Sequence, residues 1–126
     1  MIAPATLRMY DVPLGPRQPV VRMLAATVRM ARARGVPVLV IGSPVPTARL
    51  QALGAYDERT YAARFAVLRD ATEAAGGTFV DLHDAVPDAE FQDGGGHYTD
   101  AGARRLAALI DPHVHAAIAR RDGHGP

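Results

Sequence analysis

Two short apolar runs, each preceded by a helical pattern, constrain the fold of this chain more than any other feature of its sequence. The first run, residues 36–41, is continuous and β-branched, which is typical of a strand buried on both faces. The second, residues 78–82, is expected to be the next strand. Because a helical segment separates them, the two strands are expected to run parallel, and helices must then cover the sheet. The sequence therefore predicts a layered α/β domain.

Helical segments with recognisable ends flank both strands. Apolar residues recur at helical spacing across residues 18–34, with Pro19 in the first turn and Gly35 just past the end. A second helix is expected to begin near Asp57, whose side chain can cap it, and to end at the glycine pair 76–77. With a further helix after the second strand, the expected order is helix, strand, helix, strand, helix.

The last helix is expected to follow Thr99, whose hydroxyl can cap its first turn. The pair Asp111-Pro112 predicts a break into two pieces, because proline lacks the backbone N–H and clashes with the preceding turn. The expected apolar face consists of Leu106, Leu109, Ile110, Val114 and Ile118.

Two strands make a thin sheet, and parallel sheets are usually covered on both faces and have more strands. We therefore expect the domain to be incomplete, with a second copy or a partner chain completing the sheet. The expected divisions are an irregular lead-in at residues 1–17, an α/β portion at 18–120 and a frayed tail at 121–126.

Composition excludes several classes of function. The 14 basic and 13 acidic residues give a net charge of +1, so no global field favours nucleic acid or a membrane surface. The absence of cysteine excludes disulfides, thiolate catalysis and cysteine-based metal sites. No signal peptide and no apolar run of about 20 residues is visible, so we expect a cytoplasmic chain as written. An extracytoplasmic location would follow if a longer N-terminus carried an export signal.

Asp93 and His97 stand on either side of three glycines, directly before the last helix. A turn without side chains lets the two residues approach each other, and the loops after both strands emerge at the carboxyl edge where α/β sheets bind ligands. A carboxylate that orients an imidazole is the arrangement of a general base. The alternative is an ordinary loop histidine, with Asp93 bonding only loop amides.

The sequence does not identify a nucleophile as directly as it identifies a general base. Ser43, directly after the first strand, is the only serine of the chain. Pro44 and Pro46 remove two N–H groups that an oxyanion hole would use, so we do not expect Ser43 to be the nucleophile.

Two other chemistries have partial support in the sequence. A hard-ligand metal site would use the side chains of His83, Asp84, Asp93 and His97, but their spacing matches no recognised metal motif. The glycines 94–96 could cradle a phosphate before a helix, yet the chain has no lysine for a P-loop. We predict neither a metal nor a cofactor.

The run from Asp93 through His97-Tyr98-Thr99 to Gly102 resembles the last sequence block of the SGNH/GDSL-type hydrolases and acyltransferases. That block is commonly Asp-x-x-His, an apolar residue, Thr, two variable residues and Gly. Residues 35–46 look like the family's strand and proline-rich loop, and residues 61–82 look like the helix and strand before the block. The likeness runs from about residue 18 to 119 and is closest to outlying members linked to polysaccharide O-acylation.

The resemblance implies a three-layer, flavodoxin-like (SGNH-hydrolase-like) α/β fold, of which residues 18–120 supply the C-terminal part. It implies hydrolysis or transfer of an ester-linked acyl group of a small-molecule or carbohydrate ester by a serine nucleophile. His97 would take the proton of that serine and return one to the leaving alcohol. Asp93 would hold the imidazolium.

Three departures from the family pattern bear on this expectation. The spacing Asp-x-x-x-His is one residue longer than usual, and the glycines 94–96 can absorb it. No Gly-Asp-Ser turn is present, and the chain has no asparagine for the oxyanion hole. The serine and the oxyanion donors are therefore expected from outside this chain. The alternative is a catalytically inactive remnant or a small binding module of the same fold.

Overall fold

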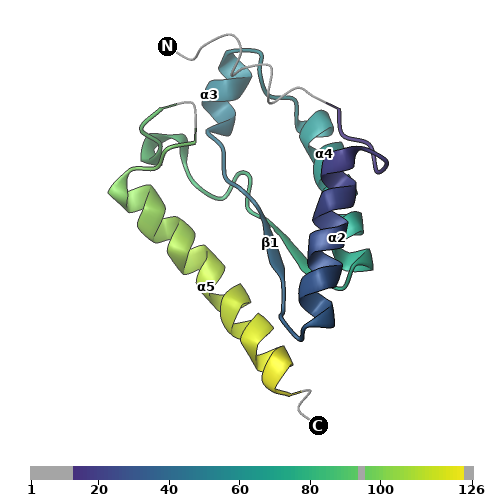
Figure 1. Cartoon of the computed structure of the whole chain (residues 1–126). Coiled ribbons are helices and arrows are strands. Elements are labelled where there is room, and N and C mark those ends of the chain that lie inside the picture. Colours follow the sequence, from purple (N-terminus) through teal and green to yellow (C-terminus); the bar gives the residue numbers. More distant parts are fainter. Residues whose placement is uncertain (1–12, 94–95, 124–126) are drawn as a thin grey trace.

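The computed structural model describes residues 13–93 and 96–123, so residues 1–12 of the expected lead-in and 124–126 of the expected tail lie outside it. Along the described chain the elements are α2 (Pro19–Ala33), β1 (Leu39–Gly42), α3 (Thr47–Ala52), α4 (Glu58–Ala74), β2 (Thr78–Asp81), the 3-10 helix η2 (Asp88–Glu90) and α5 (Asp100–Asp122) (Figure 1). The fold is mixed α/β and mostly helical.

The sheet of the described chain is one parallel pair, in which Leu39 lies opposite Thr78 and Gly42 opposite Asp81. The expected parallel order is thus confirmed. In Figure 1, β1 lies between α5 on one side and α2 with α4 on the other. The expectation that the first strand is buried on both faces is wrong, because residues 39–41 are only half-buried. A sheet of two strands with a loosely packed α5 leaves part of each face of β1 uncovered.

Helices α2 and α4 pack against each other, and α4 also packs on β2. The cap expected at Asp57 is confirmed, since its carboxylate accepts the backbone N–H of Thr60 at 2.8 Å. Gly77 lies so close to the packed helices that a Cβ there would come within 2.9 Å of Thr72 and 3.0 Å of Val28. The core apolar residues include Val21, Val28, Leu50, Tyr61, Phe79, Leu82, Val86 and Phe91.

Helix α5 begins where the sequence predicts and continues further than predicted. The Thr99 hydroxyl accepts the backbone N–H of Gly102 at 3.2 Å, which confirms the cap. The expected break at Asp111-Pro112 is wrong, because the helix runs without interruption over 23 residues with Pro112 inside it. Pro112 and Ala108, one turn earlier, are both exposed, so water can bond the carbonyl group that loses its partner.

The apolar face expected on α5 is not buried as a stripe. Val114 and Ile118 are 40% and 49% exposed, whereas Ala117 between them is buried. Helix α2 likewise leaves Val20 and Met23 exposed. Apolar side chains therefore remain uncovered on the outer faces of both helices.

Helix α3 and η2 were not expected from the sequence. Pro46 precedes α3 and has no side chain that can cap it, but the Asp88 carboxylate accepts the N–H groups of Ala48 at 3.3 Å and Arg49 at 2.6 Å. Leu50 then buries its side chain completely. A residue about 40 positions away therefore stabilises the start of this short helix.

Replacement of Gly102 by alanine tests the packing of α5 onto η2. A Cβ at Gly102 would lie 2.5 Å from the backbone carbonyl oxygen of Glu90, so the backbone must shift. We expect Gly102→Ala to lower the free energy of unfolding by about 1–2 kcal/mol, after the gain in helix propensity is subtracted. Urea denaturation measures this. The control is Gly15→Ala, whose Cβ meets nothing within 4 Å, and an equal loss in both variants would contradict the prediction.

Candidate functional site

The loop before α5 is closed at its base by backbone hydrogen bonds. Phe91 and Tyr98 form an antiparallel bridge, and the N–H of Gln92 donates to the carbonyl oxygen of His97 at 2.8 Å. The N–H of Thr99 donates to the carbonyl oxygen of Glu90 at 2.9 Å. These bonds fix both ends of the loop, and Gly96 within it has a φ of +92°, which favours glycine. Residues 94 and 95 lie outside the described chain.

The structure brings Asp93 and His97 together. The Nδ1 atom of His97 lies 2.6 Å from Oδ2 of Asp93, and the backbone N–H of His97 donates to Oδ1 at 3.3 Å. A carboxylate only accepts, so Nδ1 carries the proton of this bond and a neutral ring keeps its lone pair on Nε2. The side chains of His97 and Asp93 are 76% and 49% exposed. The pair is therefore oriented and open to solvent.

Ser43 lies at the same edge as this loop, as expected. Its hydroxyl is 3.3 Å from the Tyr98 hydroxyl, which itself donates to the carbonyl oxygen of Pro44 at 3.2 Å. Because the Tyr98 proton is used on Pro44, Ser43 is the donor to Tyr98. Within the described chain no hydrogen bond joins Ser43 to His97.

A second histidine–aspartate pair, which the sequence reasoning missed as a pair, lies at the end of β2. Nδ1 of His83 is 2.7 Å from Oδ1 of Asp81, and the backbone N–H of His83 donates to the same oxygen at 3.0 Å. Its other nitrogen, Nε2, lies 3.0 Å from the hydroxyl of Tyr56, which also bonds Glu58. The side chain of His83 is only 10% exposed.

This buried pair lies where the loops after the two strands are held together, at the carboxyl edge of the sheet. The carbonyl oxygen of His83 accepts the N–H of Val45 at 2.9 Å, which ties the loop after β1 to the loop after β2. The ring packs among Tyr61 and Phe65 at centroid distances of 5.8 and 5.4 Å. Burial, followed by the hydrogen bond and charge of Glu58, raises the pKa of Tyr56, so its hydroxyl stays protonated. With both ring nitrogens engaged, His83 serves the structure and does not face a substrate.

One sequence signal could have identified the His83 pair. Asp81 and His83 are two residues apart at the end of a strand, and such residues point to the same face. The metal site weighed from the sequence needed His83 beside His97, whereas each histidine pairs with its own aspartate. Within residues 13–93 and 96–123, no three potential ligands of the His, Asp or Glu type are grouped to hold a metal ion.

Glu90 joins the base of the loop to α5 through its side chain. The Nε and Nη2 atoms of Arg105 each lie 2.8 Å from a different carboxylate oxygen of Glu90. These hydrogen bonds hold the pKa of the Glu90 carboxyl below its usual value. The loop is thus held by both the backbone and the side chain of Glu90.

No protein-family model, curated protein or solved structure matches this chain. Among the described helices, none combines the length and the apolar character needed to cross a bilayer.

The lowered pKa of Glu90 predicts a pH dependence of stability. The stabilisation from its ion pair is complete above the usual value of 4.5 and is lost as the pH falls through the lower pKa of the folded state. Glu90→Gln removes this titration, so wild type and variant should converge in stability between about pH 6 and pH 3. Urea midpoints across this range measure the effect. A stability difference that stays constant with pH would contradict it.

The two histidine–aspartate pairs outside the loop provide a matched test of burial. His83→Phe keeps an aromatic ring but removes the imidazole bonds to Asp81 and Tyr56, and we expect a loss of about 1–2 kcal/mol of unfolding free energy. His115 pairs with Asp111 at 3.3 Å, and both side chains are largely exposed. His115→Phe should therefore change stability by less than about 0.5 kcal/mol in the same urea assay. Equal losses of unfolding free energy in the two variants would mean that the buried bonds of His83 do not stabilise the carboxyl edge of the sheet.

Proposed function

We propose that this chain is the C-terminal portion of an SGNH-type ester hydrolase or O-acyltransferase with a three-layer, flavodoxin-like parent fold. The observation that carries the proposal is the 2.6 Å bond between Nδ1 of His97 and Oδ2 of Asp93 on an exposed ring. The extra residue in the Asp-x-x-x-His spacing does not prevent this bond.

The remaining residues of the sequence block have physical roles that support the proposal. Thr99 caps α5 and also donates its hydroxyl to the carbonyl oxygen of Glu90 at 3.2 Å. Gly102 allows that same carbonyl group to approach the first turn of the helix. Together, Thr99 and Gly102 hold His97 at the carboxyl edge of the sheet, which is the edge where α/β proteins bind ligands.

The chemistry would proceed through an acyl-enzyme. A serine hydroxyl attacks the acyl carbon of the ester while Nε2 of His97 takes its proton, and Asp93 stabilises the resulting imidazolium. The proton then passes to the oxygen of the leaving alcohol. Water in a hydrolase, or an acceptor hydroxyl in a transferase, releases the acyl group by the same steps in reverse order.

The serine and the oxyanion donors come from outside this chain in our proposal. Ser43 donates its hydroxyl to Tyr98, and Pro44 has no N–H to offer an oxyanion. A second copy or a partner chain would complete the sheet, with the exposed apolar residues of α2 and α5 as its contacts. The substrate would be a small-molecule or carbohydrate ester.

The role of His97 can be tested on the chain alone with an activated ester such as 4-nitrophenyl acetate. We expect hydrolysis above the buffer rate, because an imidazole oriented by a carboxylate can activate water. His97→Ala should remove most of that rate, and Asp93→Asn should lower it. In a completed site the loss from His97→Ala should reach roughly 100-fold or more.

His115→Ala is the matched control, since His115 is also an exposed histidine four residues after an aspartate. If His97→Ala and His115→Ala hydrolyse the ester equally fast, the loop has no special reactivity. The chain would then be an inactive remnant or a binding module of the same fold.

The origin of the nucleophile is tested separately with a fluorophosphonate probe and mass spectrometry. We expect Ser43 to stay unlabelled in the folded chain, because its hydroxyl bonds Tyr98 and has no described bond to His97. Labelling of Ser43 that disappears in His97→Ala would place the nucleophile within this chain and overturn that part of the proposal.

A further inference from the structure

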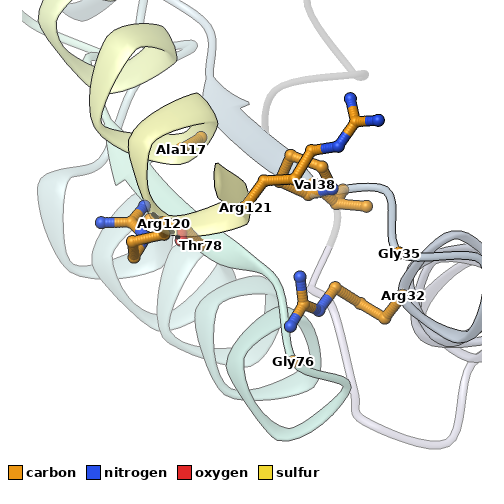
Figure 2. A pocket seen from close by; sticks show the side chains of 9 residues that line it. Arg32, Gly35, Val38, Gly76, Thr78, Ala117, Arg120 and Arg121 are labelled. Carbon is orange, nitrogen blue, oxygen red and sulfur yellow. Dashed lines mark hydrogen bonds between the residues drawn. The ribbon is translucent and has the colours of Figure 1, made fainter. Parts of the chain in front are cut away.

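A cavity of about 340 Å³ lies at the amino ends of the two strands, at the opposite edge of the sheet from the His97 loop. Arg32 lines it from α2, Arg120 and Arg121 line it from the end of α5, and Thr78 lies at the start of β2. In Figure 2, the guanidinium group of Arg32 points inward above Gly76, whereas Arg120 and Arg121 extend to opposite sides of the end of α5. Its volume falls within the range of small-molecule sites, which begins at roughly 300 Å³.

The charge of this cavity is positive. The described residues that line it include three arginines and no acidic residue. The C-terminal ends of α2, α4 and α5 also border it, and each carries about half a negative charge from the helix dipole. Arg120 already donates to Thr78, and the two full charges of Arg32 and Arg121 by themselves exceed the charge of about −1.5 on the three helix ends. The arginines therefore do more than balance the helix ends.

The helix ends do not use these arginines as hydrogen-bond donors either. At the end of α2 the N–H groups of Arg34 and Gly35 bond the last carbonyl groups, and the guanidinium of Arg34 donates to the carbonyl oxygen of Met30 at 3.1 Å. Among the described residues, the guanidinium groups of Arg32 and Arg121 have no hydrogen-bond partner and no ion pair. The N–H donors of these two guanidinium groups are therefore available to a ligand.

We propose that this cavity binds a small molecule that carries a phosphate group. The guanidinium group presents paired N–H donors that match phosphate oxygens, and it stays charged at any physiological pH. The hydroxyl of Thr78, 3.4 Å from Nη2 of Arg120, adds a further donor at the same place. Gly76, with a φ of +88°, lines the cavity without a side chain, where a Cβ would contact Arg32 at 3.5 Å. The site is independent of the ester chemistry proposed for His97.

The test is a titration of the labelled chain with pyrophosphate and with inorganic phosphate, followed by NMR and calorimetry at constant ionic strength. We expect saturable binding in the millimolar range or tighter, with shifts at the amides of Arg32, Gly76 and Thr78. Arg32→Gln and Arg121→Gln should each weaken binding roughly tenfold or more, as expected for a lost charged hydrogen bond. Arg104→Gln, an exposed arginine near the other end of α5, should leave binding unchanged.

Three results would overturn the proposal. The first is the absence of saturable binding, with all variants shown to be folded by circular dichroism. The second is equal weakening by Arg104→Gln, which would indicate a nonspecific effect of net charge. The third is equally tight binding of citrate at matched ionic strength, which would indicate an anion site without preference for phosphate.

Discussion

The parallel pairing of β1 with β2 is the interaction on which the rest of the molecule depends. Because both strands run the same way, the loops after Gly42 and Asp81 emerge side by side. The bond between the N–H of Val45 and the carbonyl oxygen of His83 then joins these loops. The loop that carries His97 is added through Tyr98, whose hydroxyl bonds Pro44. Four residues of pairing in each strand thus determine which side chains share the carboxyl edge.

Two histidine–aspartate pairs of similar local geometry lie at or near this edge, and their surroundings give them different chemistry. His83 is buried, bonds through both nitrogens and packs among aromatic rings. Such a ring holds structure together because every bond it could offer is already made. Among the residues that the structure describes, the His97 ring is bonded through Nδ1 only, and it is exposed. The difference lies in the neighbours of each pair, since the bonds from Nδ1 to the aspartate oxygens measure 2.7 and 2.6 Å.

Local signals predicted local structure in this chain. The caps at Asp57 and Thr99 and the end of α2 before Gly35 all follow from residues within a few positions of one another. The approach of Asp93 to His97 was also predictable, since both lie on one short loop. The long-range features were not predictable in this way. Helix α3 depends on Asp88, and Pro112 is tolerated because its side of α5 faces water. Strand β1 is half-buried because the other elements cover little of the sheet. The spacing of apolar residues in the sequence does not show how much of a sheet will be covered.

The shortness of the strands has a consequence for any segment that completes the sheet. A four-residue parallel strand offers only a few backbone groups along its outer edge, and each hydrogen bond there contributes about 0.5–1.5 kcal/mol net. Association of two separate chains costs about 4–15 kcal/mol in lost freedom of motion. Backbone pairing alone therefore cannot hold a completing strand. Its affinity and its selectivity would have to come from side chains that bury residues such as Met23 and Ile118. Recognition at this sheet would be decided by the helices beside the edge and not by the edge itself.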